Sequence, residues 1–109
     1  MRIAHVNFSD ARDGISGSVR SRMEAQKKQG DAPTLFSPLV TTPEADVRQL
    51  RPVCQEFATA LRGFEQNNGI AGLSAELLLD LWRQPDFLAA DIVHLHATTS
   101  NYFSLYLLP

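Results

Sequence analysis

Two histidines stand two positions apart in the run Asp91-Ile-Val-His-Leu-His96. Because side chains alternate along a strand, His94 and His96 should lie on the same face. Zinc needs three or four ligands, and no acidic residue or cysteine stands at a recognisable spacing from this pair, so we expect no metal site. We interpret His94 as a buried, hydrogen-bonded residue. His96 is the candidate catalytic residue, placed at the strand's carboxyl end to bind a hydroxyl or transfer a proton.

A glycine-containing loop is the second candidate functional segment, as a possible phosphate-binding loop. It reads Asp13-Gly-Ile-Ser-Gly-Ser18 and follows the first apolar segment of the chain. Glycines let a backbone approach a ligand closely, and the amides that open a helix attract phosphate. The spacing is G-x-x-G, which matches neither the dinucleotide fingerprint nor the phosphate-binding loop. Two interpretations therefore stay open, a plain turn and a ligand-facing loop.

Composition narrows the class of protein. The chain has 109 residues, enough for one domain. Its 12 acidic and 10 basic residues give a formal net charge of -2, and a chain without a basic excess is not expected to bind nucleic acid. A hydrophobic fraction of 44% is typical of a globular protein. The single cysteine, Cys54, excludes an internal disulfide. The longest stretch without Asp, Glu, Lys or Arg, 92–109, is too polar for a good membrane span. We therefore expect a soluble, reduced, cytoplasmic protein.

The elements that would position these residues follow from their patterns. We predict strands at 2–8, 32–40 and 91–96, and a loop at 9–17. We predict helices from Ser18 to Gln29, from Pro52 to a stop at Asn67-Asn-Gly69, from Ser74 to a stop at Pro85, and from Asn101 to Leu108. A helical turn could begin at Thr42-Pro43. Strands that alternate with helices predict an α/β sandwich with a parallel sheet.

Several short motifs occur in a characteristic order. The chain begins Met1-Arg-Ile-Ala-His-Val-Asn, continues with the Gly14–Ser18 loop and a helix that ends Lys28-Gln-Gly-Asp31, and later contains the Asp91–His96 run. This order resembles the N-terminal half of GT-B glycosyltransferases, particularly those of family 4. Two departures are visible: the adjacent glycines of the family are separated here, and the usual histidine after Gly30 is absent.

The resemblance implies a three-layer Rossmann-like sandwich with a mainly parallel sheet. Residues 1–109 would then be a partial, acceptor-side domain of a GT-B fold, without the C-terminal nucleotide-sugar domain. The implied reaction transfers a sugar from a nucleotide-sugar to a glycan or lipid-linked acceptor, with no metal or other cofactor. The full-length enzyme would make peripheral membrane contact, and this segment alone would be inactive. The implied roles are donor-phosphate binding by Gly14, Ser16 and Gly17, acceptor binding by Asn7, Thr98 and Thr99, and a contact of His96 with the transferred sugar.

A second interpretation is a free-standing, flavodoxin-like binding or regulatory module without catalysis. Both interpretations predict that the first and last strands are parallel in one sheet, with Gly14 and His96 at the same end of it.

Overall fold

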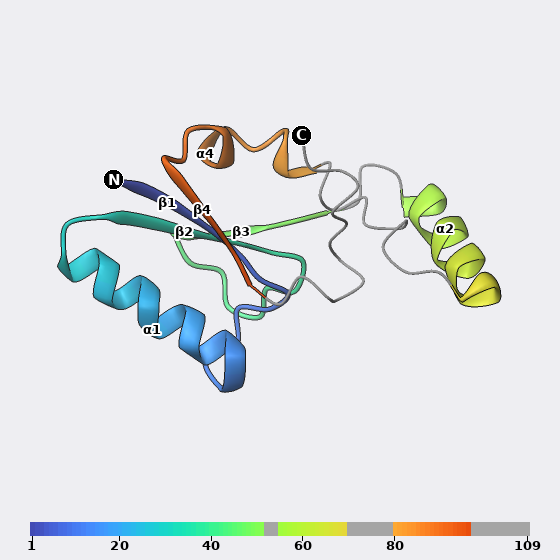
Figure 1. Ribbon diagram of the computed structural model, residues 1–109, viewed down its shortest axis with the longest axis horizontal. Coiled ribbons are helices and arrows are strands. Elements are labelled where there is room, and N and C mark those ends of the chain that lie inside the picture. Colours follow the sequence, from blue (N-terminus) through green and yellow to red (C-terminus); the bar gives the residue numbers. More distant parts are fainter. Residues whose placement is uncertain (52–54, 70–79, 97–109) are drawn as a thin grey trace.

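A parallel sheet forms the centre of the molecule. The computed structural model describes residues 1–51, 55–69 and 80–96. Its strands lie in the order β3-β2-β1-β4, and every neighbouring pair is parallel (Figure 1). This confirms an α/β fold, and it confirms that the first and last described strands share one sheet. The strands are β1 (Arg2–Val6), β2 (Ala32–Ser37), β3 (Val47–Gln49) and β4 (Ile92–Leu95).

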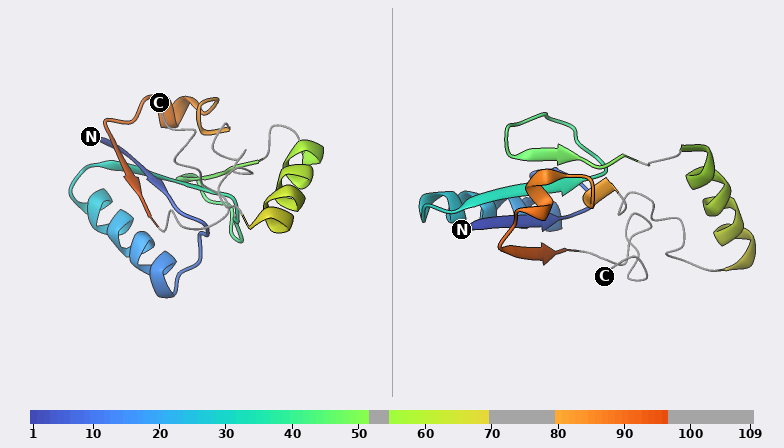
Figure 2. Two further views of the ribbon diagram at one scale, coloured as in Figure 1. Left: turned by 45° about the vertical axis from the view of Figure 1, so that its right-hand side comes forward. Right: turned by 90° about the horizontal axis from the view of Figure 1, so that it is seen from above.

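Helices lie on both faces of this sheet. Helix α1 (Gly14–Lys28) packs on one face, and the short helix α4 (Pro85–Leu88) lies against the other. Helix α2 (Gln55–Asn68) lies to one side of the sheet, past the end of β3 (Figures 1 and 2). The arrangement places α1 and α4 in separate layers with the sheet between them.

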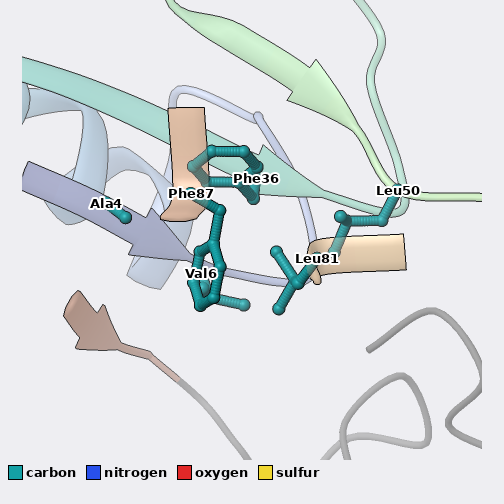
Figure 3. Close-up of a cluster of buried hydrophobic side chains, with 6 residues drawn as sticks. All are labelled: Ala4, Val6, Phe36, Leu50, Leu81 and Phe87. Carbon is teal, nitrogen blue, oxygen red and sulfur yellow. The ribbon is translucent and has the colours of Figure 1, made fainter. Parts of the chain in front are cut away.

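Alternation along the strands supplies a core to each face. Phe36 of β2 meets Phe87 of α4 edge-on, with ring centroids 5.6 Å apart. On the opposite face, Leu35 packs with Val19 and Met23 of α1. Figure 3 shows the cluster on the α4 side, which consists of Ala4, Val6, Phe36, Leu50, Leu81 and Phe87. The odd-numbered residues of β1 lie on the face opposite this cluster, as the alternation of side chains along a strand requires.

Helix α1 begins four residues earlier than predicted. The expected loop at 9–17 ends at Asp13, and Gly14 through Gly17 form the first turn of the helix. Two glycines in four residues lower helix propensity, which is why the pattern indicated a loop. The predicted end of the helix is confirmed, because α1 ends at Lys28 and Gly30 has a left-handed φ of 89°.

Two short elements were not predicted. Strand β3 is found close to where a helical turn was expected after Thr42-Pro43. Pro85 begins α4 instead of only ending the helix before it, consistent with proline's tolerance at a first helical position.

Helix α2 ends at Asn68, near the predicted stop, and Gly69 follows with a φ of 64°. The starts of the helices predicted at Pro52 and Ser74, the residue Cys54 and the helix predicted at 101–108 lie outside the described residues.

Candidate functional site

The carboxyl ends of β1 and β4 lie side by side. Val6 is paired with Leu95, and the His96 backbone N–H donates to the Val6 carbonyl at 2.9 Å. Helix α1 begins after the loop that leaves β1 at this same end (Figure 1). His96 and the start of α1 are therefore at one end of the sheet, as predicted.

The loop after β1 is held by buried polar side chains. Asn7 is fully buried, and its Nδ2 donates to the Ser9 carbonyl and to Ser16 Oγ, each at 3.0 Å. Ser16 is only 3% exposed. In this arrangement both side chains join the loop to the first turn of α1. Neither side chain is exposed to a ligand. Binding of an acceptor by Asn7 or of phosphate by Ser16 would require the hydrogen bond between these two residues to break.

The two glycines of the predicted phosphate loop have different surroundings. Gly14 is exposed, has a left-handed φ of 58°, and has nothing within 4 Å of the position that a Cβ would occupy. A Cβ at Gly17 would lie 2.7 Å from the Arg12 carbonyl oxygen. Gly14 thus offers the close backbone approach that a ligand needs, whereas Gly17 is required for packing of the helix against the loop.

An open hollow lies over the first two turns of α1. Its two cationic residues are Arg12, which forms an ion pair with Glu44, and Arg22, which forms no ion pair with any described residue. The positive end of a helix dipole and exposed backbone N–H groups favour an anion at such a place. The full lining is Arg12, Asp13, Gly14, Gly17, Ser18, Ser21 and Arg22.

A cluster of three histidines lies on the α1 face of the sheet. His5 of β1 is directly opposite His94 of β4, and His96 is one pleat further along. His5 Nδ1 and His96 Nε2 are 2.9 Å apart, and the His94 and His96 rings are stacked with centroids 3.9 Å apart. The separate environments expected for His94 and His96 are therefore wrong, since both rings belong to one cluster.

Burial and nearby charge act on this cluster. Burial lowers the pKa of His96 to about 4, with further contributions from the charges of His94, His5 and Arg22. Burial also lowers the pKa of His5, although a hydrogen bond with Gln26 opposes the shift. The His5 and His96 rings are accordingly neutral at pH 7. Arg22 lines the hollow and also acts on both rings, so the hollow and the cluster are electrostatically coupled.

Sequence reasoning missed His5 as a member of the site. The first strand was predicted, but its neighbour in the sheet was not. Only the pairing of β1 with β4 brings together residues 5 and 94. Thr98 and Thr99, the remaining candidates for acceptor binding, lie outside the described residues.

The carboxylate of Asp10 fixes a second loop at this end of the sheet. It accepts hydrogen bonds from the Thr41 and Thr42 backbone N–H groups and from the Thr41 hydroxyl, at 2.9–3.0 Å. Burial alone would raise the pKa of Asp10, but these donors outweigh it, and the pKa is lowered. The loop after β2 is thereby attached to the loop after β1.

Asp10→Asn is expected to reduce the free energy of unfolding at pH 7 by about 1–3 kcal/mol, because charged hydrogen bonds are lost. A carboxyl group with a depressed pKa stabilises the fold above its unfolded pKa of about 4, and this contribution is lost as the pH falls further. The difference between the two proteins should therefore shrink below pH 4. Urea unfolding at a series of pH values measures the difference in free energy of unfolding between the wild type and Asp10→Asn. A difference that stays constant down to pH 3 would contradict this assignment.

Comparisons with known proteins identify no relative. No family model matches the chain, and no curated protein or solved structure shows significant similarity to it. Among the described residues, no helix combines the length and the apolar character needed to cross a bilayer.

Proposed function

We propose that this chain is the acceptor-side, Rossmann-like domain of a two-domain glycosyltransferase. Such an enzyme would transfer a sugar from a nucleotide-sugar to a glycan or lipid-linked acceptor. The observation that supports this best is that the hollow at the start of α1 and His96 at the end of β4 lie at the same end of the sheet. The hollow suits a diphosphate, and His96 suits the hydroxyls of a sugar.

The strand order supports the same proposal. The order β3-β2-β1-β4 is that of the first four strands of a doubly wound, dinucleotide-binding type of sheet. In such sheets the order reverses between β1 and β4, and ligands bind outside the carboxyl ends of the strands at the reversal. The loop that follows β1 and the residue His96 both lie at that position.

Each group has a chemical role in this proposal. The Gly14 backbone approaches the donor diphosphate, and the exposed Arg22 guanidinium adds positive charge at the rim of the hollow. His96 contacts the transferred sugar, and as a neutral imidazole it can accept a hydrogen bond from a hydroxyl. Because Asn7 and Ser16 are buried, their role in this proposal is to hold the loop rather than to bind substrate.

The experiment is a titration of the isotope-labelled chain with uridine- and guanosine-diphosphate sugars, followed by amide chemical shifts. We expect weak binding, with the largest shifts at Gly14, Gly17 and Ser18. Arg22→Gln should weaken binding about threefold to fivefold, the amount expected for an exposed charge contact of up to about 1 kcal/mol. Arg83→Gln, at an exposed position that does not line the hollow, is the matched control.

Two results would contradict the proposal. One is the absence of any shift at the start of α1 with every nucleotide-sugar, while other parts of the chain respond. The other is robust sugar transfer by the chain alone, because catalysis in a two-domain enzyme needs groups of both domains around one reacting centre.

A further inference from the structure

All three histidines of the chain converge on one place. The sequence contains only His5, His94 and His96, and the ring nitrogens that could serve as ligands all lie within 4.8 Å of one another. His5 is fully buried and the other two are half-buried. The cluster is therefore shielded on one side and accessible on the other. It also supplies the third ligand whose absence led us to expect no metal site.

Gln26 of α1 sets the orientation of the central ring. Its Oε1 lies 2.8 Å from His5 Nε2. A carbonyl oxygen only accepts hydrogen bonds, so His5 carries its proton on Nε2 and directs the Nδ1 lone pair toward the other two rings. A metal-binding histidine is typically held in this way, with its second nitrogen donating to an oxygen acceptor.

The donor set indicates the class of ion. Three imidazole ligands suit Zn²⁺ and neighbouring transition metals, whereas Mg²⁺ and Ca²⁺ prefer oxygen ligands. In a tetrahedral zinc site, Zn–N distances of about 2.0–2.1 Å place ligand nitrogens roughly 3.3 Å apart. His5 Nδ1 and His96 Nε2 are closer than this, at 2.9 Å, because His96 Nε2–H donates a hydrogen bond to the His5 Nδ1 lone pair, and a bound ion would replace that proton. Adjustments of about an ångström or less at each ring would bring all three nitrogens to that spacing.

We propose that His5, His94 and His96 form a binding site for a divalent transition metal ion, with Zn²⁺ as the preferred ion and Gln26 as the residue that orients His5. Three protein ligands leave the fourth tetrahedral position for water or an anion. The Arg22 guanidinium is the nearby cationic group that acts on the cluster. Its charge opposes the cation and favours an anion as the fourth ligand. This inference does not rest on the proposed sugar transfer, but both involve His96: with the ion bound, the His96 ring has no lone pair left, and it could contact a sugar hydroxyl only by donating from its second nitrogen.

The test is a zinc titration of the tag-free chain in competition with a chromophoric indicator. We expect one Zn²⁺ per chain. His94→Gln and His96→Gln should each lower the affinity at least tenfold. Gln26→Leu leaves all three ligands in place and should lower it about 10- to 100-fold, as loss of an orienting partner does. Cys54→Ser, which removes the only thiol, should leave zinc affinity unchanged.

A spectroscopic measurement complements the titration. Co²⁺ bound by three imidazoles in a tetrahedral site should give intense visible absorption, and His94→Gln should abolish it. Amide spectra establish whether each variant is folded. If His96→Gln unfolds, His94→Gln decides the question, because the His94 ring is half-buried on the outermost of the described strands. The proposal is overturned if the chain takes up no zinc saturably, if the histidine variants bind as well as the wild type, or if Cys54→Ser removes the site. Nucleotide-sugar binding is measured separately, so either proposal can fail without the other.

Discussion

Replacing Phe36 with alanine is expected to lower the free energy of unfolding by about 3–5 kcal/mol. Phe36 is fully buried in the centre of the sheet, in contact with Phe87 and in the same cluster as Leu81 (Figure 3). Truncation removes its transfer free energy and leaves a cavity between the sheet and α4. A domain of this size typically has a total stability of about 5–15 kcal/mol, so the variant should be close to unfolding at 37 °C.

Urea unfolding followed by circular dichroism measures this loss. Phe64→Ala is the matched control, because the Phe64 side chain on α2 is 51% exposed. Its loss should cost less than about 1 kcal/mol, as for an ordinary surface substitution. Equal effects of the two substitutions would mean that the cluster on the α4 side is not the main core of the domain.

Gly17→Ala and Gly63→Ala are expected to change stability in opposite directions. The Cβ added at Gly17 would meet the Arg12 carbonyl carbon and oxygen at 2.7–2.8 Å, so the loop or the helix must move. Such overpacking typically costs about 1–3 kcal/mol. Gly63 lies within α2 with nothing within 4 Å of its added Cβ, so alanine there should stabilise the helix by about 0.5–1 kcal/mol.

Thermal unfolding of the two variants beside the wild type provides the comparison. The Gly17→Ala protein should also show amide shifts confined to the loop after β1 and the first turn of α1, where the collision occurs. A stabilised Gly17→Ala protein would contradict the packing role of this glycine.

Local patterns predicted the parts of the fold that depend on local interactions. The patterns at 2–8 and 91–96 predicted β1 and β4, and the run Lys28-Gln-Gly-Asp31 marked the end of α1. Strand β3 has only three residues, Val47–Gln49, and carries one buried side chain. This segment is a strand because it pairs with β2. Three residues are too few to show the alternation of apolar and polar residues by which a strand is predicted from sequence.

The candidate site was predictable only in part for the same reason. The position of His96 beside the start of α1 follows from parallel strands and right-handed connections, which the sequence pattern indicates. The inclusion of His5 required the strand order. The burial of Asn7 and Ser16 required the packing of α1, since polar residues after a strand are more often exposed. Each missed feature depends on contacts between segments that are distant in sequence.

The pairing of β1 with β4 has a consequence for the order of folding. Arg2 bonds to Asp91 across a separation of 89 residues, whereas Arg2 pairs with Ala32 of β2 through the much shorter segment that contains α1. Closing the roughly threefold longer segment costs about 1 kcal/mol more in chain entropy. We therefore expect β1, α1 and β2 to assemble first and β4 to join last. His5 meets His94 and His96 only when β4 pairs with β1 in that final step. Formation of the histidine cluster would therefore mark the completion of folding.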